Sequence, residues 1–150
     1  MNLNPLEVLR SASIGMLDGS MLGPREGYEQ ASSLVFGLAL GIVADQLETA
    51  AADLVEENDV IRGLFREALA IPDVGSADLR TRWEAPGNGS EDSLLVSVLR
   101  ETNDVLRDLL SELLVAVEAV ESADARRLEE HIWDELNRST ERRAVAIAPF

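Results

Sequence analysis

Two stretches of this chain are nearly identical and lie 45 positions apart. "EENDVIRGLF" begins at Glu56, and "ETNDVLRDLL" begins at Glu101. Both are rich in residues that favour helices, and neither shows the period-two alternation of a strand. Such a pair strongly constrains the fold, because two similar helices present similar faces to their neighbours. We therefore predict that these two helices contribute matching faces to one core.

Apolar residues recur in both stretches with the four-and-three spacing of a heptad. The two series are Leu54, Asn58, Ile61, Phe65, Ala68 and Leu99, Asn103, Leu106, Leu110, Leu113. Each series places one asparagine in the apolar seam, away from solvent. A buried amide without a partner costs about 1–3 kcal/mol. We therefore expect Asn58 and Asn103 to hydrogen-bond to each other in a dry interior.

An arginine follows each asparagine by four residues. These arginines could reach back to the amide, or outward to a carboxylate such as Asp59 or Asp104. One interpretation is that the four polar residues fix register and helix order at some cost in stability. A second is a polar pocket for an anionic ligand, and a third is that the heptad is assigned in the wrong register. The binding residues of the second interpretation would be Asn58, Arg62, Asn103 and Arg107.

The whole chain of 150 residues is predicted to be one all-α domain, residues 1–150. We expect an up-and-down four-helix bundle with helices at about 4–17, 24–69, 90–121 and 122–143. Asn4 and Pro5 suit the first helix start, and Ser90 suits the third as its N-cap. One straight rod over 24–69 would measure about 67 Å, too long for a compact domain. We therefore expect a kink or a break at 56–59, giving one kinked helix or two.

Residues 71–92 are predicted to form one long irregular loop, because prolines and glycines cluster there. Arg80, Arg82 and Trp83 in this loop could dock a partner, or Trp83 could plug the end of the bundle. The tail "AVAIAPF", residues 144–150, is apolar and is expected to lie against the bundle.

The most apolar run is "ASSLVFGLALGIVA", Ala31 to Ala44, with 14 residues. It is shorter than the ~20 residues of a bilayer span, so we expect a buried helix rather than a membrane segment. Ser33, Gly37 and Gly41 form a small-residue stripe within it that lets another helix approach closely. The third helix carries more apolar residues than one stripe holds. A homodimer that buries this surplus is the preferred interpretation, and a tunnel for an acyl chain is the alternative.

The charge is strongly acidic, with 28 acidic residues, 13 arginines and a net charge of −15. Such a field repels nucleic acids and anionic membranes, so we expect neither as a partner. The chain has no cysteine, and its start lacks a secretory pattern, which favours a cytoplasmic bacterial protein. Its one histidine, His131, is too few for a di-iron site, and no nucleotide or hydrolase motif occurs. We therefore expect no enzymatic activity, metal or cofactor.

Three further segments carry a family resemblance: "DLVEENDVIRGLFREAL", "TNDVLRDLLSELL" and "IWDELNRSTERR". There the chain resembles an uncharacterised group of bacterial all-helical proteins. Relatives of that kind are sometimes encoded near acyl-CoA dehydrogenases, and the resemblance supplies no catalytic residues. We expect a non-enzymatic, self-associating interaction or accessory protein. The alternative is a bundle that binds a small molecule or an acyl chain, accessory to enzymes of acyl-CoA metabolism.

Overall fold

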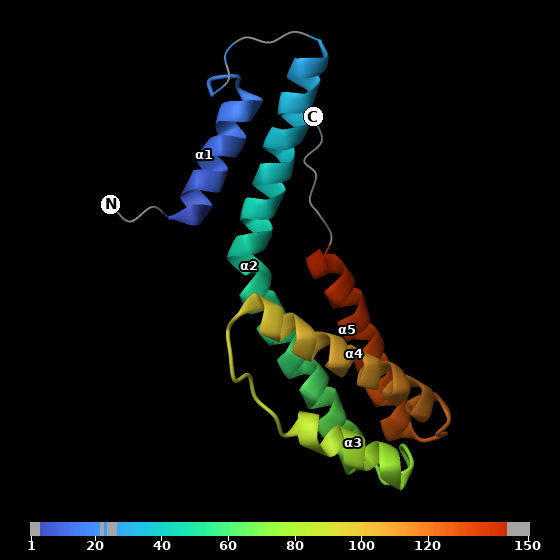
Figure 1. Cartoon of the computed structure of the whole chain (residues 1–150). Coiled ribbons are helices and arrows are strands. Elements are labelled where there is room, and N and C mark those ends of the chain that lie inside the picture. Colours follow the sequence, from blue (N-terminus) through green and yellow to red (C-terminus); the bar gives the residue numbers. More distant parts are fainter. Residues whose placement is uncertain (1–3, 22, 24–26, 144–150) are drawn as a thin grey trace. The chain divides into compact units, whose positions relative to one another are not determined.

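The chain is all α-helical in a computed structural model that describes residues 4–21, 23 and 27–143 (Figure 1). No strand occurs in these ranges, so the predicted all-α class is confirmed. They form five helices rather than the expected four: α1 (Pro5–Leu17), α2 (Tyr28–Ala70), α3 (Ala77–Gly87), α4 (Val96–Glu118) and α5 (Ala123–Arg143). The tail predicted to pack at residues 144–150 lies outside the described residues.

Helix α2 runs without interruption for 43 residues. Of the kink or break expected at 56–59, the break is therefore wrong, and the kink stays a prediction. That expectation assumed one compact body, in which a rod of about 65 Å does not fit. The described residues instead group into two compact units, one within Met1–Ala50 and one within Ala51–Phe150. Because α2 supplies residues to both units, its length requires no break.

The first unit pairs α1 with the first half of α2 through small residues. The Ser13 hydroxyl donates a hydrogen bond of 2.7 Å to the carbonyl oxygen of Gly37. A Cβ added to Gly37 would lie 2.9 Å from Cγ of Leu17, and one added to Gly41 would lie 3.1 Å from Oγ of Ser13. The glycines of the predicted small-residue stripe therefore face α1 and allow its close approach.

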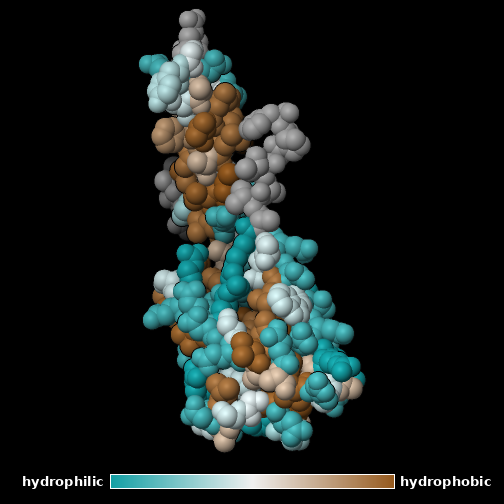
Figure 2. Space-filling model, turned by 90° about the vertical axis from the view of Figure 1, so that its right-hand side faces the viewer, coloured by the Kyte–Doolittle hydropathy of each residue, from teal (hydrophilic) through white to brown (hydrophobic). Residues whose placement is uncertain are grey.

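The same unit leaves large apolar side chains on its outside. Four side chains of α2 are between 51% and 64% exposed: Val35, Phe36, Val43 and Leu47. Figure 2 shows apolar surface over this part of the chain. The expectation that Ala31 to Ala44 form a buried helix is therefore wrong, since only Gly37 and Ala44 are buried there. The physical reason is that a single neighbouring helix covers only one side of α2.

The second unit has a continuous core built on the predicted heptad series. Its largest buried side chains come from α2, α3, α4 and α5: Ile61, Phe65, Trp83, Leu106, Leu113, Leu128 and Ile132. In α4, the buried positions step by four and three from Leu99 to Val117, as the sequence predicts. The apolar surplus expected on this helix is therefore absorbed within the unit in part. Val98, Val105 and Val115 remain exposed on α4, and Leu94 and Leu95 are exposed just before it.

The loop predicted at residues 71–92 is interrupted by α3. The prediction is therefore wrong for Ala77–Gly87. The Ser76 hydroxyl caps α3 by accepting a hydrogen bond of 3.3 Å from the Leu79 amide. Trp83 has no exposed surface and belongs to the core, which confirms the plugging interpretation. Arg80 donates to carbonyls at the end of α2 and just beyond it, at 2.8 Å to Ile71 and 3.1 Å to Val74. Packing of Trp83 and bonding of Arg80 thus order a segment whose composition suggests a loop.

Two predicted helix starts are correct and a third is wrong. Asn4 caps α1, accepting a hydrogen bond of 3.1 Å from the Leu6 amide. Helix α5 begins just after Ser122, as expected. Helix α4 begins at Val96 rather than at Ser90, and no side chain caps it. The acidic residue that suggested the earlier start, Glu91, lies 10% exposed and bonds to α2 instead.

Candidate functional site

The two predicted asparagines meet in the core of the second unit. Asn58 of α2 and Asn103 of α4 are 0% and 1% exposed. Nδ2 of Asn103 donates a hydrogen bond of 2.9 Å to Oδ1 of Asn58. The predicted contact is therefore confirmed, and with it the heptad register of both helices.

The remaining amide atoms of this pair also have protein partners. Nδ2 of Asn58 donates to Oε1 of Glu91 at 2.8 Å and to the Leu99 carbonyl at 3.3 Å. Oδ1 of Asn103 accepts a hydrogen bond of 3.1 Å from Arg143. Each oxygen and each nitrogen of the two amides is thereby bonded, so neither amide carries the desolvation cost of an unpaired buried group.

Glu57, which the sequence does not single out, is the centre of a second cluster beside the asparagines. Its carboxylate accepts hydrogen bonds of 2.7 Å from Arg107, 3.0 Å from Arg143 and 3.1 Å from the Ser139 hydroxyl. Burial alone would raise the pKa of the Glu57 carboxyl. The hydrogen bond from Arg107 and the positive charge of Arg143 together hold that pKa below its ordinary value. Glu57 is therefore an ionised carboxylate inside the unit.

Arg62 and Arg107 reach different partners although they occupy equivalent places in the repeat. Arg62, 4% exposed, donates a hydrogen bond of 2.7 Å to Oε1 of Glu91 and a longer one of 3.4 Å to Asp59. The predicted partner Asp59 is thus found, but only as the weaker of two. Arg107 donates to Glu57 and Ser139 rather than to Asn103 or Asp104. The expected local partners of Arg107 are therefore wrong, because α2 and α5 each bring a closer acceptor.

A third buried ion pair joins two residues of α5. Arg142 hydrogen-bonds to Glu135, whose side chain is 2% exposed. Burial raises the pKa of the Glu135 carboxyl above its ordinary value, and the charge of Arg142 offsets part of that effect. His131, on the same helix, is 47% exposed, and its Nδ1 lies 3.1 Å from Oε2 of Glu67. Among the described residues, no group of three or more histidines, cysteines or acids is placed to hold a metal ion.

The charges of this cluster balance once its rim is included. Three arginines (Arg62, Arg107 and Arg143) face three carboxylates: buried Glu57, part-buried Glu91 and the more exposed Asp59. An anionic ligand at Asn58, Arg62, Asn103 and Arg107 would therefore have to replace a carboxylate of the chain itself. The arrangement provides what the register interpretation requires, namely a bonded polar layer that fixes how α2, α4 and α5 meet. A ligand-binding role for the four residues stays a prediction.

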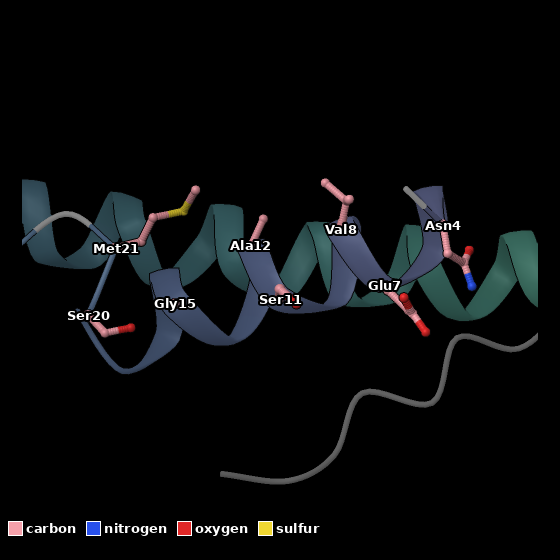
Figure 3. Close-up of a pocket in the computed structure, with 8 residues that line it drawn as sticks. All are labelled: Asn4, Glu7, Val8, Ser11, Ala12, Gly15, Ser20 and Met21. Carbon is pink, nitrogen blue, oxygen red and sulfur yellow. The ribbon is translucent and has the colours of Figure 1, made fainter. Parts of the chain in front are cut away.

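The first unit contains a hollow on the side of α1. It has a volume of about 590 Å³ and is lined by Asn4, Glu7, Val8, Ser11, Ala12, Gly15, Ser20 and Met21. Figure 3 shows Val8, Ala12 and Met21 projecting along one edge and Glu7 and Ser20 along the other. The hollow thus has an apolar edge and a polar edge, and the sequence alone gave no signal for it.

Comparison with known proteins adds no relative. No family model, curated protein or solved structure matches the chain. A functional proposal therefore depends on the contacts and surfaces of this chain alone.

Proposed function

We propose that this chain is a non-enzymatic interaction protein that associates with a second copy of itself through the outward side of α2. One observation carries the proposal. The first unit buries small residues between its helices and leaves large apolar side chains outside, among them Val35 and Phe36 at 64% exposure each. In a water-soluble unit the reverse distribution is expected, because burial of large apolar groups is what stabilises it.

The amount of exposed apolar surface suits a subunit interface. Five large apolar side chains of α2 in the first unit are at least 51% exposed: Tyr28, Val35, Phe36, Val43 and Leu47. Together they present several hundred Å², which approaches the ~800 Å² per partner of a standard interface. Patches of this size on monomeric proteins are uncommon and mark sites of interaction.

The second unit supports this role as a stable body. Its asparagine pair and Glu57 have hydrogen-bond partners within the unit, and its apolar residues form one cluster shared by four helices. Such a unit folds around its own contacts and needs no partner to do so.

Sedimentation velocity at micromolar concentration tests the proposal through Val43→Glu. We expect the unchanged chain to sediment as a dimer. The variant should sediment as a monomer, because the interface would have to bury an unpaired charge. Val105→Glu is the matched control, since Val105 is an exposed valine (57%) on α4. A monomeric unchanged chain, or a Val43→Glu variant that still dimerises, would contradict the proposal.

The hollow beside α1 favours a second candidate, a module that binds a small apolar molecule such as an acyl chain. Its volume of about 590 Å³ falls within the ~300–1,000 Å³ typical of ligand pockets. Native mass spectrometry of protein purified from its host tests this candidate. A retained mass that is lost in Ala12→Trp, which fills the hollow, would support it, and a bare polypeptide mass would not.

A further inference from the structure

The outward side of α2 carries a regular seam of its own. Steps of four and three join six residues: Ser32, Phe36, Ala39, Val43, Gln46 and Ala50. Phe36 and Val43 of this seam are 64% and 51% exposed, and Ala39 is also exposed. We call these six residues the outer seam.

The outer seam is separate from the side that α1 covers. At about 100° per residue, Ala39 lies roughly 160° around the helix axis from Gly37. Gly37 is buried against α1, where its carbonyl accepts the hydrogen bond from Ser13. The outer seam therefore faces away from α1 and is free for another helix.

The residues flanking the outer seam are apolar as well. Val35 and Ile42 lie on one side of it, and Leu40 and Leu47 on the other. A two-stranded coiled coil needs only a narrow seam, whereas apolar flanking positions are typical of helices in bundles. The pattern fits a contact between two helix pairs, in which four helices share one core.

The order of side chains along the outer seam is self-complementary. When the seam is laid antiparallel on a copy of itself about position 41, Ala39 meets Val43, Phe36 meets Gln46 and Ser32 meets Ala50. At the centre the small Ala39 then opposes the larger Val43, which lets the two seams interdigitate there. Phe36 opposes the amide Gln46, and the two small residues Ser32 and Ala50 meet at the ends. Such a contact is isologous and closes after two copies.

Charge also favours a second copy over a bilayer. No ionisable residue occurs from Gln30 to Ala44. Two negatively charged copies can therefore meet there without placing like charges against each other. By length and composition alone, α2 is the one helix of the described chain that could cross a membrane, and 11% of its most apolar window is buried. Its uncharged run of 15 residues spans only about 22 Å, less than the ~30 Å of a hydrocarbon core.

We propose that the outer seams of two copies pack antiparallel about position 41, forming a four-helix assembly from two α1–α2 pairs. This inference rests on the self-association proposed above and specifies its geometry. The two ends of the seam, Ser32 and Ala50, then lie side by side across the interface. A parallel contact would instead place each Ser32 beside its own equivalent.

Disulfide cross-linking tests the geometry directly, because the chain has no cysteine of its own. We would oxidise Ser32→Cys alone, Ala50→Cys alone and a mixture of the two. The antiparallel contact predicts a covalent dimer in the mixture, with little in either variant alone. The ends of the seam are about 27 Å apart along the helix, so the two geometries give different results. Ser97→Cys, an exposed position on α4, is the control for random collision.

Two kinds of contrary outcome distinguish a failure of the antiparallel geometry from a failure of self-association. A covalent dimer of Ser32→Cys alone, or no cross-link in a chain that sediments as a dimer, overturns the antiparallel seam and leaves self-association standing. A monomer in sedimentation overturns both. Co-flotation of that monomer with phosphatidylcholine vesicles would assign the apolar surface of α2 to a membrane instead.

Discussion

Polar side chains inside the second unit depend on partners from several helices. Asn58 and Asn103 meet at 2.9 Å, and Glu57 receives hydrogen bonds from α4 and α5. Each group would be costly if buried alone, so the layer specifies one arrangement of helices. The residues of this layer therefore decide how the helices pack, while the apolar residues supply most of the driving force.

The coupling between the two asparagines can be measured by a double-mutant cycle. Asn58→Ala and Asn103→Ala should each lower the free energy of unfolding by about 1–3 kcal/mol, because each leaves the other amide short of a partner. The double variant should lose less than the sum, with a coupling of about 1 kcal/mol. Urea unfolding gives all three values. Asn137→Ala, at an exposed position of α5, is the control, and strict additivity would contradict a direct contact.

The stability contributed by Glu57 should depend on pH. Its pKa lies below the ordinary value in the folded state, so its contribution is present above the unfolded pKa and is lost as pH falls through the folded pKa. Glu57→Gln should cost roughly 2 kcal/mol at pH 7 and progressively less in acid. Urea unfolding at neutral and acidic pH measures the difference between the two chains. A difference that stays constant or grows in acid would show that Glu57 is not held ionised.

Sequence predicts part of this layer. The asparagine pair follows from the heptad, because the four-and-three spacing of apolar residues places both amides in the apolar seam. Glu57 sits one residue before Asn58 and has no such signal. Its partners Ser139 and Arg143 lie more than 80 residues away in sequence. Only the docking of α5 brings them together, and helix periodicity carries no information about that docking.

The ends of helices in this chain depend on contacts of single residues, and such contacts are predictable only when they are local. The cap of α1 by Asn4 is local and was predicted. Helix α3 was missed because its anchor, Trp83, is stabilised by the distant core rather than by helix propensity. The start of α4 was misplaced because Glu91 bonds to Arg62 of another helix. Long-range contacts thus override local signals at these two places.

Arg80 should act as a cap for α2 supplied from α3. Its guanidinium donates to the carbonyls of Ile71 and Val74 and to others in the last turn of α2. Arg80→Ala should therefore lower the free energy of unfolding by about 1–3 kcal/mol, because part-buried carbonyls lose their donor.

Arg82→Ala is the matched control for that change. Arg82 lies on the same helix and makes two hydrogen bonds to Glu112, but both side chains are largely exposed. Exposed ion pairs contribute about 0–1 kcal/mol. Equal losses for the two variants in urea unfolding would show that Arg80 is another surface arginine and not a cap.

As a whole molecule, the chain combines a well-packed second unit with a first unit that exposes apolar surface. Sequence reasoning expected one four-helix bundle and placed the unburied apolar residues on the third predicted helix. The structure leaves Leu94, Leu95 and Val115 exposed there, and it adds a second exposed apolar region on the first half of α2, where Val35 and Phe36 lie. The hydropathy of the run from Ala31 to Ala44 was evident in the sequence. Hydropathy alone does not say whether the same chain or another one covers such a helix.

Association of two such chains should strengthen with salt. Each copy carries a net charge of −15, so the copies repel at long range while the uncharged outer seams attract at contact. Added salt screens the repulsion over about 10 Å at 0.1 M and leaves the apolar contact in place. Analytical ultracentrifugation at low and moderate salt should therefore show tighter association at moderate salt. Dissociation by moderate salt would indicate an interface held by ion pairs.

Sedimentation equilibrium of the unchanged chain across the micromolar range tests the central claim most directly, because it reports mass without any label or substitution. The chain has a mass of 16.3 kDa. We predict that the apparent mass rises with concentration and levels at twice that value, as the outer seams of two copies pair. A mass of 16.3 kDa at every concentration would contradict self-association through α2.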